Sequence, residues 1–158
     1  MIKEWIPAER LNCTVEVQGE PEGWIERVDL VPGETEPWDR GYELWASREI
    51  LEYVRGQRRG FSHEDQVLNR LELIRGRFHR AVLLRTMKIP YGETMAYSQV
   101  AGDLGSNAWR AAGTALANNP IPLLVPCHRV VAKHGIGGFG ECVWLKRNLL
   151  QLEGADVP

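Results

Sequence analysis

The stretch Val125-Pro126-Cys127-His128-Arg129-Val130 decides how this chain is organised, because it sets a thiol beside an imidazole within an apolar run. Pro120, Pro122 and Pro126 interrupt the ladder hydrogen bonds of this region and argue against an ordinary central strand. We therefore expect a strand-like segment that breaks into a tight turn, or one helical turn, at Cys127. Backbone N–H groups at such a turn would stabilise a thiolate and lower the pKa of the thiol.

A cysteine in an apolar run is more often a structural residue than a nucleophile, so Cys127 needs partners to carry chemistry. His128 is a candidate base. Glu153 ends the last predicted helix, where a carboxylate opposes the helix dipole at a cost of about 0.3–1 kcal/mol. A buried Glu153 that contacts His128 would complete a Cys–His–Glu relay. An exposed terminal glutamate is the alternative that the sequence leaves open.

The composition is that of a soluble globular protein, with 158 residues, 44% hydrophobic and 25% charged, enough for one domain or two small ones. No apolar run approaches a membrane span, and the N-terminus has no signal pattern. Three widely spaced cysteines do not make a disulfide framework. We expect a cytoplasmic protein, associated with the nucleoid if prokaryotic, that has no membrane contact.

Charge divides the chain into an acidic half and a basic half. Residues 1–75 carry 10 Lys/Arg and 16 Asp/Glu, whereas residues 76–158 carry 9 Lys/Arg and 5 Asp/Glu. We place the domain boundary near Gly76, at the break before the helix predicted at 78–88. The basic half contains the Cys–His pair and is compatible with a polyanionic partner, although a modest bias of this size is often only a solvated surface.

The first half, residues 1–75, is predicted to be an α/β domain without chemistry of its own. Residues 12–31 alternate weakly and predict a hairpin or small antiparallel sheet, with Cys13 as a core residue of its first strand. A helix is predicted around 41–55. His63 is expected to be an ordinary loop histidine.

The second half, residues 76–158, is predicted to be mostly helical. After a helix at 78–88 come two short helices that Thr94 and Ser106 can cap, which together have the outline of a helix-turn-helix. Many helical bundles contain such a pair, so the outline alone is weak evidence for nucleic-acid binding. Arg110 is a single long cation on the small-residue surface of the second helix, and such a side chain can enter a duplex.

A glycine-rich loop at 135–140 leads to the final helix, 142–152. The spacing of the apolar residues in this helix places Cys142 on its apolar face. The same spacing places Lys146 and Arg147 on the opposite face.

Six segments, in order and at the expected spacing, resemble the 6-O-alkylguanine-DNA alkyltransferase family, whose members move an alkyl group from guanine to their own cysteine. The resemblance covers about residues 76–154, and residues 1–75 match only loosely, as a variable ribonuclease-H-like α/β domain. The segments are Ile89-Pro90-Tyr91-Gly92-Glu93-Thr94, Arg110-Ala111-Ala112-Gly113, Asn119-Pro120-Ile121-Pro122, Pro126-Cys127-His128-Arg129-Val130-Val131, Gly137-Gly138-Phe139 and Leu149-Leu150-Gln151-Leu152-Glu153-Gly154.

The resemblance implies a role for each residue of the site. Cys127 would accept the alkyl group, and His128 and Glu153 would activate it through a water. Asn119 would brace the turn that positions the cysteine. Tyr97 would donate a hydrogen bond or a proton to the departing guanine.

The same resemblance implies duplex DNA with alkylated guanine, and also O4-alkylthymine, as the substrate of a single-turnover monomer without cofactor. Arg110 would enter the base stack in place of the flipped nucleotide. Since Cys13 is the only cysteine of the first half, we expect no zinc site there. The other implied DNA contacts are Tyr97, Ser98, Ser106, Ala111, Gly113 and Lys133. The implied pocket residues are Pro122, Val130, Phe139 and Gly140.

The chain departs from the family pattern at two places. Glu141 and Cys142 stand where small residues are usual and would narrow the pocket, and Trp109 replaces a small residue just before Arg110. Two other functions remain open: a turnover cysteine hydrolase or acyltransferase acting on a small molecule, and a non-catalytic alkyl-lesion sensor. Sensors of that kind lack the acceptor cysteine, so Cys127 argues against the last.

Overall fold

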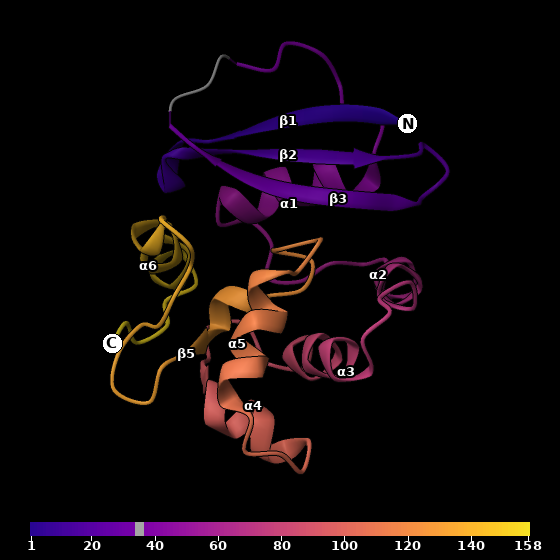
Figure 1. The fold of residues 1–158 in the computed structure, drawn as a ribbon. Coiled ribbons are helices and arrows are strands. Elements are labelled where there is room, and N and C mark those ends of the chain that lie inside the picture. Colours follow the sequence, from indigo (N-terminus) through magenta and orange to yellow (C-terminus); the bar gives the residue numbers. More distant parts are fainter. Residues whose placement is uncertain (34–36) are drawn as a thin grey trace.

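The computed structural model describes residues 1–33 and 37–158, in which a three-stranded sheet lies beside a group of helices (Figure 1). Strands β1 (Ile2–Ala8), β2 (Cys13–Gly19) and β3 (Ile25–Pro32) pair antiparallel in that order. The small antiparallel sheet expected at 12–31 is confirmed as β2 and β3, and Cys13 is buried at the start of β2. The sequence pattern does not predict β1.

The alternation of apolar and polar residues fails to predict β1 because one of its buried residues is a glutamate. Glu4 occupies an inward-facing position of the strand, where an apolar residue is expected, and it is almost fully buried. Its two oxygens accept hydrogen bonds from the backbone N–H groups of Glu43 (2.6 Å) and Leu44 (2.9 Å). Glu4 therefore accepts hydrogen bonds from N–H groups just before the helix that begins at Trp45. A prediction that expects only apolar residues to be buried cannot anticipate this role.

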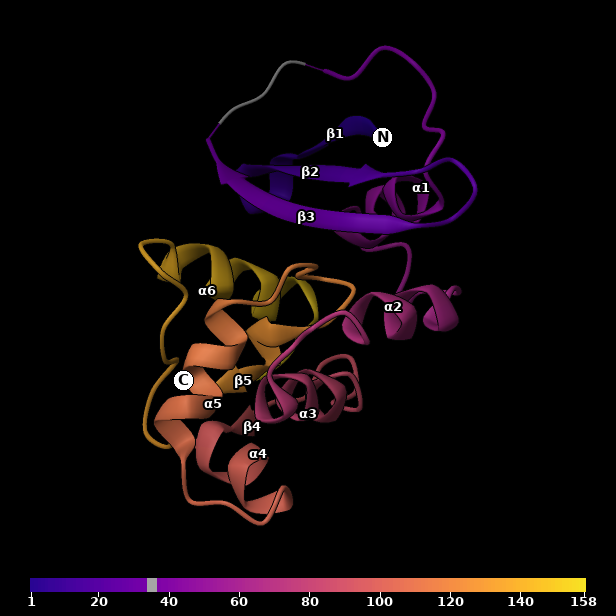
Figure 2. The same ribbon diagram turned by 45° about the vertical axis from the view of Figure 1, so that its right-hand side comes forward.

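Helix α1 (Trp45–Val54) covers one face of the sheet, as the two views show (Figures 1 and 2). This helix lies within the range 41–55 in which a helix was expected. It begins directly after Leu44, whose N–H donates to Glu4. A short helix, α2 (Glu64–Leu71), follows where none is predicted, because it buries only Val67 and Leu71. His63 precedes α2, and its ring stacks on Trp45 with centroids 4.4 Å apart.

The second half is mostly helical, as expected. Helix α3 (Arg77–Thr86) confirms the helix predicted at 78–88, and the last helix is α6 (Val143–Leu152). Between them lie α4 (Tyr97–Asp103), α5 (Trp109–Ala117) and the short parallel pair β4 (Met95–Ala96) and β5 (Val130–Val131).

The predicted caps of the two short helices are wrong. Helix α4 begins after Ala96, whose N–H donates to the side chain of Gln99, so Thr94 is not its cap. Helix α5 begins three residues after Ser106. The Ser106 hydroxyl accepts the N–H of Ala108 and so closes the turn before the helix instead of capping it.

The two halves share direct hydrogen bonds. The N–H of Val28 in β3 donates to the carbonyl of Pro120 (3.0 Å), and the side chain of Asn148 in α6 donates to the carbonyl of Leu11 (3.4 Å). The domain boundary near Gly76 stays a prediction. No helix within residues 1–33 and 37–158 is long and apolar enough to cross a membrane.

Candidate active site

The segment around Cys127 makes the expected turn. Residues Cys127–Arg129 form one turn of 3-10 helix, and Asn119 holds the chain before it. The Asn119 side chain donates to the carbonyl of Val125 (2.9 Å) and accepts the N–H of Ile121 (3.0 Å). Leu123, between these points, has a φ of 75°, which a leucine adopts only when its surroundings fix it.

Glu153 is buried and contacts His128, as the relay hypothesis requires. The distance between His128 Nε2 and Glu153 Oε2 is 2.8 Å. The Tyr53 hydroxyl from α1 donates to the same oxygen, and the N–H of Gly92 donates to the other oxygen at 3.2 Å. The carboxylate thus joins the end of α6 to the Cys–His turn, to α1 and to the loop before β4.

Arg129 is the partner that the sequence reasoning missed. Its Nε and Nη2 atoms each lie 2.9 Å from a different oxygen of Glu153, and its Nη1 donates to the carbonyl of Ile89 at 2.7 Å. A sequence signal existed: an arginine inside an apolar run needs a buried anion. Arg129 and His128 lower the pKa of Glu153 against the opposing effect of burial, so the carboxylate is ionised at neutral pH.

The ring of His128 is poised to accept a proton. Burial lowers its pKa, and the hydrogen bond and charge of Glu153 oppose that shift, so the ring is neutral near pH 7. When Nε2–H donates to Glu153, Nδ1 is left as the acceptor. Among the described residues no hydrogen bond joins His128 to the Cys127 thiol, so the structure does not show a direct Cys–His contact.

The expectation of a lowered pKa at Cys127 is wrong. Burial raises the pKa of the thiol above its ordinary 9.0. A hydrogen bond from Asn119, the charge of Lys146 and the N–H groups of Cys127 and His128 act in the opposite direction but do not reverse the shift. The turn supplies the expected N–H groups, yet loss of water around a group that is only 8% exposed is the larger effect.

Lys146 does not face solvent. It is 1% exposed, and its ammonium group donates to the carbonyls of Val130 (2.6 Å) and Gly138 (3.1 Å). It also lies 3.3 Å from the Tyr97 hydroxyl. Burial lowers its pKa to about 8. A lysine on a predicted polar face is normally exposed, so only the fold could show that three oxygens surround this one.

Tyr97 packs against the glycine-rich loop. A Cβ added at Gly137, whose φ is +80°, would lie 2.8 Å from the Tyr97 ring. Burial raises the pKa of the Tyr97 hydroxyl, so the group carries its proton at neutral pH. This residue can therefore act as a proton donor toward a ligand in the adjoining cavity.

A cavity of about 790 Å³ has Cys127 in its wall. It brings together the expected residues Tyr97, Arg110, Gly113, Asn119, Pro122, Phe139 and Gly140. Val130 is fully buried outside it, and Glu141 and Cys142 are not in its wall, so the expected narrowing has no support. The wall also includes Arg27, Val28, Asp29 and Leu30 of β3, a contribution of the first half that the sequence reasoning missed.

The remaining residues of the expected DNA surface lie outside the cavity. Ser98, Ala111 and Lys133 are exposed, and Ser106 is half-buried. Arg110 is exposed at the first turn of α5 and makes no ion pair among the described residues. Its guanidinium lies 5.1 Å from the centre of the Trp109 ring. A free cation beside an open cavity is the arrangement that the DNA hypothesis needs.

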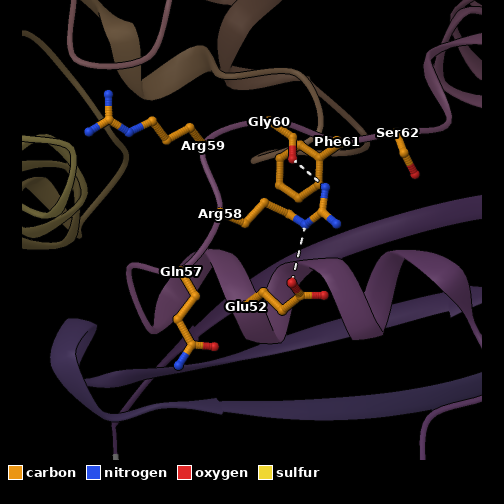
Figure 3. Close-up of a pocket in the computed structure, with 7 residues that line it drawn as sticks. All are labelled: Glu52, Gln57, Arg58, Arg59, Gly60, Phe61 and Ser62. Carbon is orange, nitrogen blue, oxygen red and sulfur yellow. Dashed lines mark hydrogen bonds and ion pairs between the residues drawn. The ribbon is translucent and has the colours of Figure 1, made fainter.

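A second hollow, of about 430 Å³, lies between the end of α1 and the loop at 57–62 (Figure 3). Arg58 points into it and is already partnered, since it donates to the carbonyl of Gly60 (3.1 Å) and pairs with Glu52 (3.7 Å). The Ser62 hydroxyl in its wall lies 2.8 Å from Nδ1 of His63 and donates to Glu49 of α1. These contacts hold the loop against α1, and we assign the hollow no chemistry.

The fold and the site define an α/β protein with a buried cysteine, a histidine–glutamate pair behind it and a cavity beside an exposed cationic helix. Residues 77–155 match the model of the 6-O-methylguanine DNA methyltransferase DNA-binding domain, which is half of the chain. The chain therefore belongs to the 6-O-methylguanine DNA methyltransferase family.

Individual relatives agree with this assignment. A methylated-DNA–protein-cysteine methyltransferase of Saccharolobus islandicus is 52% identical over 81 residues, which cover 51% of this chain and 53% of that protein. The chain thus spans about half the length of the first curated relatives it matches. One from Metallosphaera sedula is 41% identical over 110 residues, covering 70% of this chain and 67% of that protein. The crystal structure of Mycobacterium tuberculosis OGT in complex with DNA has a TM-score of 0.77 and 28% identity, covering 96% and 92% of the two chains.

We expect Glu153→Gln to lower the free energy of unfolding by about 3–5 kcal/mol, because it leaves Arg129 buried without a counter-charge. The measurement is urea unfolding at pH 7. Because its partners hold the pKa of Glu153 below its ordinary 4.5, the wild-type contribution is present above that pH and is lost as the pH falls. The exposed Glu141→Gln is the control and should change stability by less than about 0.5 kcal/mol. Equal losses in the two variants would contradict the assignment.

The alkylation rate of Cys127 should keep rising above pH 9, because burial raises the pKa of its thiol. The measurement is the initial rate of labelling by a small alkylating agent between pH 6 and 11, read at Cys127 by peptide mass spectrometry, with an unstructured cysteine peptide as reference. Asn119→Ala removes a hydrogen bond that favours the thiolate and should move the inflection to still higher pH. If the labelling rate of Cys127 had its inflection at a lower pH than that of the peptide, the N–H groups of the turn would lower the thiol pKa by more than burial raises it.

Proposed function

We propose that this protein transfers the alkyl group of O6-alkylguanine in duplex DNA to the sulfur of Cys127, once per molecule. The observation that carries the proposal is the placement of Cys127 in the wall of a 790 Å³ cavity with the His128–Glu153 pair directly behind it. The names of the Saccharolobus and Metallosphaera relatives describe methyl transfer from methylated DNA to a protein cysteine, which supports the proposal. Cavities of this size hold molecules as large as a purine.

The site residues can accept and supply the protons that the displacement requires. The thiol proton passes to Nδ1 of His128, through a water, and Glu153 stabilises the resulting imidazolium while staying ionised. The sulfur then forms a bond to the alkyl carbon as the bond from that carbon to the guanine oxygen breaks. Tyr97 gives a proton to the departing guanine, and Lys146, 3.3 Å away, can stabilise the charge left on the tyrosine. The thioether has no route back to a thiol, which limits each molecule to one event.

The raised pKa at Cys127 fits such a mechanism. A thiol that stays protonated in the empty site is protected from adventitious oxidation, since the thiolate is the reactive form. His128 takes the proton when substrate is bound. The site therefore generates its nucleophile at the moment of use.

We propose that α4 and α5 act as a helix-turn-helix on DNA and that Arg110 replaces the extruded nucleotide in the stack. The target carbon is inaccessible within a duplex, so the base must turn out into the cavity, which costs a few kcal/mol and less for a damaged pair. Ser98, Ala111, Gly113 and Lys133 would contact the backbone, which gives little sequence preference and strong salt dependence. The same cavity would admit O4-alkylthymine.

The proposal also includes the fold of the first domain, the oligomeric state and the location of the protein. We propose a first domain, residues 1–75, of ribonuclease-H-like topology, to which the order β1-β2-β3 with α1 on one face is suited. We further propose a monomer in the cytoplasm, where a reducing environment keeps the acceptor thiol free. No metal or cofactor is needed for the displacement.

The cysteine hydrolase is the second candidate, and the buried Cys–His–Glu arrangement favours it. It differs from the first in requiring many turnovers, and it leaves Arg110 and the α4–α5 pair without a role. The lesion sensor is disfavoured because Cys127 is present.

Incubation with duplex DNA containing O6-methylguanine should add one methyl group per protein, located at Cys127. Intact-mass and peptide mass spectrometry measure the stoichiometry and the site. Cys127→Ala should take up no methyl group and still bind the duplex. An unmodified Cys127 after complete exposure to such DNA, in protein shown to be folded, would overturn the proposed function.

Arg110→Glu should weaken duplex binding and slow repair by at least tenfold, because it replaces the inserted cation by an anion that phosphates repel. Fluorescence anisotropy gives the affinity, and the rate with a free O6-alkylguanine base gives a second readout. The loss should be much larger with the duplex than with the free base. Equal losses would favour a small-molecule enzyme in which Arg110 is only part of the cavity.

A further inference from the structure

Trp109 is the large aromatic residue at the mouth of the Cys127 cavity. It is the first residue of α5, it is 49% exposed, and it lines the cavity together with Arg110. Arg27 and Asp29 of β3 line the same cavity and pair with each other at 2.8 Å. The exposed indole can therefore contact a ligand that enters this cavity.

Packing does not account for this side chain. The buried face of α5 consists of Ala112, Ala115 and Leu116, and Trp109 is not part of the hydrophobic core. Its indole N–H donates to no acceptor among the described residues, whereas that of Trp45 donates to the carbonyl of Gly23. A tryptophan so little used by the fold is available to a partner.

A cation–π contact of the Trp109 ring, the one interaction it makes with residues 1–33 and 37–158, points to what that partner is. The guanidinium of Arg110 lies 5.1 Å from the ring centre, in the range of a cation–π contact. The proposed function moves Arg110 into the duplex during repair. That movement uncovers an indole face next to the base whose neighbour has just been extruded.

We propose that Trp109 stacks on a DNA base beside the extruded nucleotide, on the ring face that Arg110 covers in the free protein. This inference rests on the proposed function and adds to Arg110 a second side chain that contacts the base stack. The contact with Arg110 is exchanged for a contact with the flat face of a base, which every base offers. It therefore strengthens binding without adding sequence preference, as repair of scattered lesions requires.

The charge of Arg110 also benefits from this arrangement before DNA arrives. An arginine held over an aromatic ring samples fewer conformations than a free one, so part of the ordering cost of insertion is met in the unbound protein. Trp109 thus first holds the arginine by a cation–π contact and then stacks on the base. Both roles need a flat aromatic ring and no hydrogen bond.

The test compares Trp109→Ala and Trp109→Phe in a Cys127→Ala background, so that binding is measured without reaction. The probe is a dye-labelled duplex with one O6-methylguanine, titrated by fluorescence anisotropy at several salt concentrations. We expect Trp109→Ala to bind about 5- to 30-fold more weakly and Trp109→Phe to recover most of the affinity, as alanine substitution of a stacking aromatic does. The control is Trp144→Ala on α6, 38% exposed and outside the cavity wall, which should bind within twofold of the parent.

The salt dependence separates stacking from a loss of phosphate contacts. Loss of a stacked base leaves the slope of log affinity against log salt unchanged, whereas loss of one phosphate contact reduces it by about one. Unchanged or tighter binding by Trp109→Ala, or a reduced slope, would overturn the inference. Methyl uptake by the wild-type protein, measured by mass spectrometry on the same duplex, distinguishes this failure from that of the proposed function: uptake with no effect of Trp109→Ala removes only the stacking role.

Discussion

The ion pair between Glu153 and Arg129, buried together with His128 and Tyr53, is the constraint on which the rest of the structure depends. One carboxylate receives two N–H groups from the arginine, the imidazole, a tyrosine hydroxyl and a backbone N–H. These donors come from three separate segments of the chain, and Glu153 itself ends a fourth. A buried charge without them would cost several kcal/mol, so the segments must assemble around it. The position of the reactive turn follows from that requirement.

This constraint also sets the electrostatics around the sulfur. A dry interior disfavours the thiolate of Cys127 and the charged form of Lys146 alike: burial raises the pKa of the thiol and lowers the pKa of the lysine to about 8. The charged lysine favours the thiolate, and the thiolate favours the charged lysine, so neither titrates independently. Near pH 7 the thiol is therefore neutral while Lys146 is still mostly charged, so the resting site holds one ammonium group besides the Glu153–Arg129 pair.

The parts of this fold that depend on local pattern could be predicted from the sequence. The prolines before Cys127 predict its turn, and the misplaced carboxylate at the end of α6 gives a buried Glu153 beside His128 as one of two alternatives, the one that the structure shows. Residues that satisfy a distant partner could not be predicted: Glu4 in β1 serves the start of α1, and Lys146 turns inward to three oxygens. Each looks like a surface residue until the tertiary fold supplies its partner. The contribution of β3 to the cavity was missed for the same reason, since β3 is far from Cys127 in the chain.

Gly137 shows how tightly the cavity is bounded on its tyrosine side. With a positive φ and the Tyr97 ring 2.8 Å from where a Cβ would stand, this position cannot accept a side chain without moving the aromatic residue. Laboratory reshaping of the cavity for bulkier labels would thus find no latitude at this position of the loop. The β3 part of the wall is more permissive, because the exposed Arg27 and the half-buried Asp29 can be shortened or exchanged while the backbone stays paired within its sheet.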